Sequence, residues 1–116
     1  MKIGSILENQ TIEKRIAITP EIAKKYISLG LEVYLSENYG SHLGIEDEEY
    51  KELGALILKD EKEILINTDI IVQLSLLDDD KSLLLKENQT FVGVLNPYDN
   101  KEKINNLVKK KINIFS

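Results

Sequence analysis

The chain has 116 residues, of which 42% are hydrophobic, and its 15 Lys and Arg against 20 Asp and Glu give a formal net charge of -5. One small domain of this length can bury a single core without disulfides or structural metal. The absence of cysteine excludes a disulfide framework, a thiolate nucleophile and a cysteine zinc site, and the single histidine, His42, argues against a histidine metal cluster or a Ser-His-Asp triad.

Six short apolar runs alternate with amphipathic segments, a pattern typical of a parallel sheet with helices on both faces. The predicted strands are Lys2–Leu7, Glu32–Ser36, Leu56–Leu58, Asp69–Leu74, Thr90–Leu95 and Ile112–Ser116. The fourth and fifth runs are apolar on both faces, as expected for strands inside a sheet. The pattern predicts an α/β three-layer domain with a mostly parallel sheet.

The clearest predicted helix follows Thr19-Pro20-Glu21 and ends at Gly30. Thr19 suits the N-cap, Pro20 suits the first turn, and Gly30 suits the left-handed residue after the last turn. Four further helices are predicted over Glu46–Leu53, Glu61–Ile66, Asp78–Lys86 and Lys101–Lys110. The aspartates at 78–80 are interpreted as the N-terminal cap of their helix rather than as a divalent-metal site, so no metal site is predicted.

Arg15 is the only arginine in the chain and lies in the loop after the first predicted strand. A guanidinium offers two parallel donors to a carboxylate or phosphate, which an ammonium group cannot do. The loop lies at the edge where open α/β sheets bind ligands. Arg15 therefore either faces a ligand or braces its own loop.

Other polar residues follow strands whose carboxyl ends meet at the same edge. Asn96 follows the fifth strand, and Gln73 and Ser75 lie near the end of the fourth. These residues could line a cleft. Alternatively, the segment that contains Asn96 could form a turn that leads into the next helix, and Ser75 could simply begin a loop. His42 lies in a loop between two glycines and is interpreted as a surface residue.

Neither G-x-G-x-x-G nor a P-loop occurs among the six glycines. The glycine turn that lets a dinucleotide pyrophosphate approach the backbone is therefore missing. This chain alone is not expected to hold NAD tightly.

Charge and hydropathy also indicate which kinds of partner, nucleic acid or membrane, the chain is not expected to bind. The sequence pI is about 4.9 and the largest basic cluster is the lysine run at 109–111, so we expect no nucleic-acid partner. No stretch approaches the ~20 apolar residues of a membrane helix. The N-terminus lacks a signal-peptide pattern, and we therefore expect a cytoplasmic domain without direct membrane insertion.

Several sequence pieces occur in a characteristic order. They are Lys2-Ile3-Gly4, the run E-K-R-I-A-I-T-P-E at 13–21, Leu29–Val33, Leu53-Gly54-Ala55 and Asp69–Val72. Together they resemble the N-terminal domain shared by alanine dehydrogenases and the alpha subunit of proton-translocating NAD(P) transhydrogenase. The resemblance covers essentially the whole chain, and E-x-R-x-A-x-T-P is its most specific portion.

The resemblance implies a flavodoxin-like (Rossmann-like) fold and an N-terminal domain over residues 1–116, a fragment without the NAD-binding domain. Alanine dehydrogenases resemble one another in a lysine at the position of Ser75 and a histidine at that of Asn96, which serve the substrate with the arginine matched by Arg15. Gln73 also replaces a lysine common to both branches. Without an imidazole or amine at positions 75 and 96, the chain offers no evident general acid or base for that chemistry. Asn96-Pro97 and the Leu-Asp-Asp-Asp run at 77–80 resemble the transhydrogenase branch more closely.

For the full-length protein, the resemblance implies NAD(H) binding, mainly through the missing second domain, and hydride transfer between NADH and NADP⁺ coupled to proton translocation. It implies a transhydrogenase beta subunit and a membrane component as partners, and a location peripheral to the inner membrane. A homodimer is expected for a separate reason, because the exposed edge strands of a parallel sheet can pair with another copy. We expect this fragment alone to be inactive and without cofactor, with no catalytic residue and with Arg15, Gln73, Ser75 and Asn96 facing the cleft.

Two alternatives stay open. The chain could belong to a divergent alanine dehydrogenase-like, NAD-dependent amino-acid dehydrogenase. It could also be a non-catalytic flavodoxin-like interaction module, which the fold alone does not distinguish.

Overall fold

The computed structural model describes residues 1–11, 13–75, 77–93 and 101–115, in which strands and helices alternate. The strands are β1 (Lys2–Ser5), β2 (Glu32–Ser36), β3 (Leu56–Leu58), β4 (Ile70–Gln73), β5 (Thr90–Gly93) and β6 (Asn113–Phe115). The helices are α1 (Pro20–Ser28), the short 3₁₀ helix η1 (Ser41–Leu43), α2 (Asp47–Leu53), α3 (Glu61–Asn67), α4 (Asp79–Ser82) and α5 (Lys101–Lys109).

The six strands form one parallel sheet in the order β3-β2-β1-β4-β5-β6. The chain lays down β1, β2 and β3 in one direction, and then returns to place β4 on the other side of β1. The point of return between β1 and β4 is where doubly wound sheets bind ligands. The predicted Rossmann-like α/β fold is confirmed. Within that class the strand order is that of the Rossmann sheet rather than that of flavodoxin.

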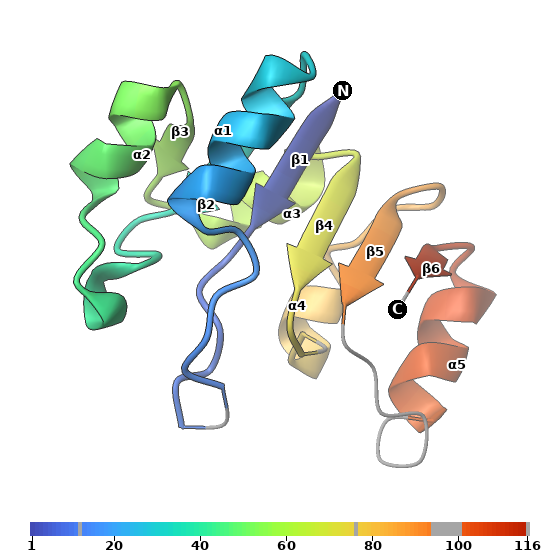
Figure 1. The fold of residues 1–116 in the computed structure, drawn as a ribbon. Helices are drawn as coiled ribbons and strands as arrows, with labels where there is room; N and C mark the ends of the chain where they lie inside the picture. The colour runs from blue at the N-terminus through green and yellow to red at the C-terminus, as the bar shows by residue number, and fades with distance from the viewer. Residues whose placement is uncertain (12, 76, 94–100, 116) are drawn as a thin grey trace.

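Helices lie on both faces of the sheet, as Figure 1 shows. On one face α1 and α2 pack over β1, β2 and β3 around a buried cluster that includes Ala23, Val33 and Tyr50. On the other face α3 and α5 pack around a second buried cluster that includes Ile64 and Phe91. These clusters join the three layers of the domain.

The first face is covered only partially. Val72, Val92 and Phe115 lie in register across β4, β5 and β6. Val72 and Val92 are only half-buried, and Phe115 is 60% exposed. Among the described residues no helix lies in front of β4 and β5 in Figure 1, so an apolar row stays open there.

The predicted ends of α1 are confirmed. The Thr19 side chain accepts a hydrogen bond from the backbone N–H of Ile22 (3.3 Å), which satisfies one of the free donors of the first turn. Gly30 follows the helix with a φ of 90°, a left-handed conformation that glycine adopts without steric cost.

Two predicted strands end earlier than the sequence indicates. The run Lys2–Leu7 becomes β1 over Lys2–Ser5, because the backbone of Ile6 bonds to the Gln73 side chain and Leu7 N donates to Ser36 Oγ (2.8 Å). Asp69–Leu74 becomes β4 over Ile70–Gln73 for a related reason, since Leu74 N donates to a carboxylate. Side chains therefore replace the strand ladder at this edge.

The helix predicted over Asp78–Lys86 is wrong in length, because α4 ends at Ser82. Beyond it, Leu84 N donates to Lys81 O (3.0 Å) and Leu85 N to Ser82 O (3.2 Å), a tighter spacing than that of an α-helix. This tighter turn buries Leu85 in the core.

Candidate functional site

The candidate site lies at the carboxyl ends of β1 and β4, the switch point of the sheet. We call this region the rim and define it as residues 5–8 and 73–75. The predicted cleft residues Gln73 and Ser75 both belong to it. The loop of residues 6–19 runs from the rim to α1 and also carries Arg15.

The centre of the rim is a buried carboxylate, Glu8, whose residue is 6% exposed. Its Oε2 accepts hydrogen bonds from Leu74 N (2.8 Å) and Gln73 Nε2 (2.9 Å). Its Oε1 accepts from Ser75 N (3.3 Å) and Ser75 Oγ (2.8 Å). Four donors from three consecutive residues therefore surround one carboxylate.

Gln73 joins β4 to the end of β1. It is 2% exposed, its Oε1 accepts from Ile6 N (2.7 Å), and its Nε2 donates to Ile6 O (3.0 Å). Ser5 Oγ donates to the same Oε1 (3.0 Å). Gln73 thus continues the pairing of β1 and β4 by one residue and directs its amide to Glu8.

Burial raises the pKa of the Glu8 carboxyl above its usual value of 4.5, and the charge of Glu13 adds to the rise. The hydrogen bonds from Leu74 and Ser75 act in the opposite direction, because they favour the ionised form. Among the described residues no lysine, arginine or histidine forms an ion pair with Glu8. Within that portion of the chain the charge is held by hydrogen bonds alone.

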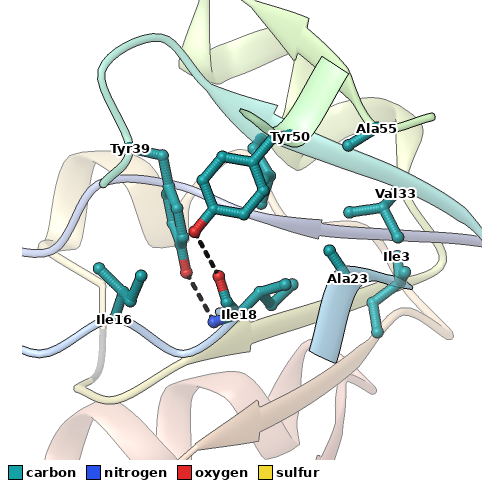
Figure 2. Close-up of a cluster of buried hydrophobic side chains, with 9 residues drawn as sticks. Ile3, Ile16, Ile18, Ala23, Val33, Tyr39, Tyr50 and Ala55 are labelled. Atoms are coloured by element: carbon teal, nitrogen blue, oxygen red, sulfur yellow. Dashed lines mark hydrogen bonds between the residues drawn. The ribbon is translucent and has the colours of Figure 1, made fainter. Parts of the chain in front are cut away.

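Two buried tyrosines hold the loop of residues 6–19 against the sheet. The Tyr39 hydroxyl accepts from Ile18 N (3.1 Å) and Ala17 N (3.2 Å), and the Tyr50 hydroxyl donates to Ile18 O (2.8 Å). Figure 2 shows both hydroxyls meeting the backbone of Ile18. The Tyr39 hydroxyl also lies 2.8 Å from Ser5 Oγ, so the loop and the rim share one hydrogen-bond network.

The two tyrosines are themselves shielded from water. Their rings meet edge to face with centroids 6.0 Å apart. Burial raises the pKa of Tyr39 to about 12 and raises that of Tyr50 as well. Both hydroxyls therefore keep their protons at neutral pH and act as hydrogen-bonding groups.

Arg15 lies in the predicted loop, and its side chain pairs with a carboxylate of the same loop. Its Nε and NH2 groups donate to the two carboxylate oxygens of Glu13, both at 2.9 Å, and its side chain is 76% exposed. Arg15 lowers the pKa of Glu13 to about 2. The guanidinium braces its loop, which was one of the two predicted roles.

His42 connects two loops at the carboxyl side of the sheet. Its Nε2 lies 2.7 Å from Lys14 O and its Nδ1 lies 3.0 Å from Gln10 Nε2. Since Nε2 must donate to a carbonyl, Nδ1 is left to accept from the amide. The prediction of an exposed loop histidine is confirmed, and its role is to tie the loops together.

The structure joins Gln73 and Ser75 through Glu8, but no hydrogen bond among the described residues joins Arg15 to them. Asn96 lies outside the described residues. Within those residues every buried side-chain nitrogen and oxygen has a hydrogen-bond partner. The described rim therefore carries no buried polar group left over for a ligand.

Sequence reasoning missed Glu8 and Tyr39. Glu8 could have been noticed, because it is a charged residue just after an apolar strand, at the edge that directed attention to Asn96. Tyr39 gave no such signal, since tyrosines scattered along a chain are usually packing residues.

In the described portion of the chain, no helix is both long enough and apolar enough to cross a membrane. No group of three or more acidic or histidine side chains there could hold a metal ion.

Comparison with known proteins gives consistent matches. The family described as "Alanine dehydrogenase/PNT, N-terminal domain" matches residues 5–116. The chain is 38% identical, over its whole length, to an NAD(P) transhydrogenase subunit alpha polypeptide of Rickettsia prowazekii, of which it covers 31%. It is 33% identical over 84% of its length to "N(5)-(carboxyethyl)ornithine synthase" of Clostridium botulinum, covering 29% of that protein.

A solved structure agrees with the fold. The transhydrogenase of Sinorhizobium meliloti superposes with a TM-score of 0.91 at 22% identity, over 100% of this chain and 34% of that one. The chain thus spans about a third of the length of each protein compared.

Proposed function

Since the chain belongs to the family of alanine dehydrogenase and PNT N-terminal domains, we propose that it is the first domain of an NAD(P) transhydrogenase alpha subunit. In this proposal the longer protein binds NAD(H) and transfers hydride between NADH and NADP⁺. The present chain supplies one wall of the cleft and no catalytic group.

The observation that carries the proposal is the closed rim. Ser75 donates both its backbone N–H and its hydroxyl to Glu8. Gln73 Nε2 donates to Glu8 and to Ile6 O, and Gln73 Oε1 accepts from Ile6 N. A dehydrogenase acting on a small amino acid or keto acid needs a group that exchanges a proton with the substrate. The described rim has no such free group, which favours a domain that shapes a cleft.

The described residues do not fit a dinucleotide. In a Rossmann sheet, the turn after the first strand carries glycines and lets the pyrophosphate approach the backbone. Here that turn carries Glu8, a buried carboxylate that would repel a phosphate. We infer that NAD(H) is held mainly by a second domain of the longer protein.

The partners follow from the same proposal. A transhydrogenase alpha subunit would work with a beta subunit and a membrane component, as a homodimer, on the cytoplasmic side of the inner membrane. This domain would not itself insert into the membrane.

The test uses the longer natural polypeptide that contains this chain. Membranes that carry it together with the beta subunit should catalyse NADH-dependent reduction of an NADP⁺ analogue, and a proton gradient should change the rate. NADH oxidation that requires pyruvate and ammonium, without transfer to the NADP⁺ analogue, would overturn the proposal in favour of an amino-acid dehydrogenase.

A second measurement tests whether NAD(H) is bound by this domain or by a second domain of the longer protein. The 116-residue chain alone, titrated with NADH and followed by nicotinamide fluorescence, should show no saturable binding, whereas the longer protein should show it. Tight NADH binding by the short chain would contradict the role of a wall.

A further inference from the structure

We propose that the bend of residues 73–75 is a carboxylate-binding site, which Glu8 occupies as an internal ligand and thereby closes to carboxylates from solution. This inference rests on the rim geometry and does not depend on the proposed function. The bend is referred to below as the 73–75 bend.

The donors of the 73–75 bend divide evenly between the two oxygens of the Glu8 carboxylate. One oxygen of Glu8 receives Leu74 N and Gln73 Nε2, and the other receives Ser75 N and Ser75 Oγ. A carboxylate offers two such oxygens, each able to accept two hydrogen bonds. Four donors divided two and two therefore match a carboxylate group.

Two of the donors are successive backbone N–H groups, and such pairs form concavities that bind anions. One of the two side-chain donors, Gln73 Nε2, is fixed by contacts other than Glu8. Gln73 is locked by Ile6 and Ser5, so its amide points to the site whether or not Glu8 is present. The site is consequently built by β1 and β4 and only filled by Glu8.

Glu8 reaches this site from a different segment, the loop after β1, and is separated from its donors by 65 to 67 positions in the sequence. A carboxylate buried to this extent has lost most of its hydration, and hydrogen bonds replace the lost water. A carboxylate ligand from solution would need the same donors. It cannot bind while Glu8 holds them.

The substitution Glu8→Ala offers a direct test. It removes four heavy atoms, namely Cγ, Cδ and the two carboxylate oxygens, and acetate consists of four heavy atoms with the same connectivity. Acetate should therefore enter the emptied site and restore the four hydrogen bonds. Formate should bind more weakly because it lacks the methyl group, and propionate should bind more weakly because it is too long.

Thermal unfolding of Glu8→Ala would be followed by circular dichroism in sodium acetate and in sodium chloride at equal ionic strength and pH. We expect Glu8→Ala to melt below the wild type in chloride. We expect acetate to reverse at least half of the decrease in Tm, and we expect this effect to saturate as the acetate concentration rises. The reason is that a ligand that binds only the folded state raises the stability of that state. The wild type should show only the small general difference between the two salts.

A matched double variant locates the effect. Glu8→Ala combined with Ser75→Ala lacks one donor and should respond to acetate several-fold more weakly. A wild-type response as large as that of Glu8→Ala, or an undiminished response in the double variant, would place the acetate elsewhere and overturn the proposal. So would a folded Glu8→Ala that responds to acetate no more than to chloride.

The wild type gives an independent measurement should Glu8→Ala not fold. Protonation of Glu8 removes the charge that the backbone N–H groups of Leu74 and Ser75 face. In a pH titration by NMR, these two amide protons should shift together with the Glu8 carboxyl carbon, with one common midpoint. Amide shifts that do not follow the Glu8 carbon would overturn the proposal.

Discussion

The loop of residues 6–19 carries two carboxylates in opposite circumstances. Glu8, at its inner end, is buried among four donors with no cation paired to it among the described residues. Glu13, further out, pairs with the exposed guanidinium of Arg15. Burial raises the pKa of Glu8, and Arg15 lowers the pKa of Glu13 to about 2.

The comparison separates two ways of holding a charge. Hydrogen bonds to a buried carboxylate fix the geometry of several segments at once, and losing the carboxylate leaves buried donors without acceptors. An exposed ion pair orders one loop and contributes little to stability. Glu8 should therefore tolerate substitution poorly, and the exposed pair of Glu13 and Arg15 should tolerate it well.

The largest expected effect is that of Glu8→Ala on stability. It leaves the donors of Gln73, Leu74 and Ser75 without their acceptor, and we expect a loss of about 3 kcal/mol in the free energy of unfolding. Urea unfolding at pH 7 measures it. The control Glu52→Ala removes an exposed carboxylate on α2 and should change stability by less than about 0.5 kcal/mol. Equal effects of the two substitutions would break the comparison.

Next in size are the tyrosines that hold the same loop. Tyr39→Phe removes the acceptor of two backbone N–H groups, and we expect a loss of about 2 kcal/mol. Tyr50→Phe removes a single bond to Ile18 O and should cost about 1 kcal/mol. Urea unfolding of both variants tests the order, and a larger loss in Tyr50→Phe would contradict it.

Glu8 and Glu13 should make the stability of the domain depend on pH in opposite directions. The folded state holds the Glu8 proton more tightly than the unfolded chain does, because the pKa of Glu8 is raised by folding. The resulting contribution to the free energy of unfolding is fully present below pH 4.5 and is lost as pH rises through the raised pKa. The Glu13 contribution is present above pH 4.5 and lost as pH falls towards 2.

Urea unfolding of the wild type, Glu8→Gln and Glu13→Gln over this pH range would measure both signs. The stability advantage of the wild type over Glu8→Gln should shrink as pH rises. Its advantage over Glu13→Gln should shrink as pH falls. Curves that run in the same direction would refute the contrast between the two sites.

The smallest effect is expected at Arg15. Arg15→Lys keeps the charge and loses the second of the two parallel hydrogen bonds, at a side chain that is 76% exposed. The urea midpoint should stay within experimental error of the wild type. A fall comparable to that of Tyr39→Phe would show that the exposed pair of Glu13 and Arg15 is structurally as important as the buried contacts of the loop.

The sequence predicts much of the fold because local signals agree with it. Thr19 and Gly30 mark the ends of α1, and the apolar runs mark all six strands. The length of α4 escaped prediction, because the need to bury Leu85 overrides the helical pattern after Ser82. The ends of β1 and β4 escaped it for another reason, since side chains from distant segments take over the backbone hydrogen bonds.

The sequence predicts where the rim lies but not which side chains contact each other there. Gln73 and Ser75 were identified from their place at the end of a strand. Their common partner Glu8 lies more than 60 positions away, and only the pairing of β1 with β4 brings them together. The pairing of Arg15 with Glu13 could not be predicted either, because the sequence contains several carboxylates with which that guanidinium could pair.

The central place of β1 has a consequence for the order in which the domain is assembled on the ribosome. β1 is synthesised first, yet its two neighbours in the sheet are β2 and β4. A nascent chain can join β1 to β2 and α1 early, but the other edge of β1 must wait until residue 73 has left the exit tunnel. Until then Glu8 has no access to its donors at residues 73–75, so the rim closes only after β4 has been synthesised.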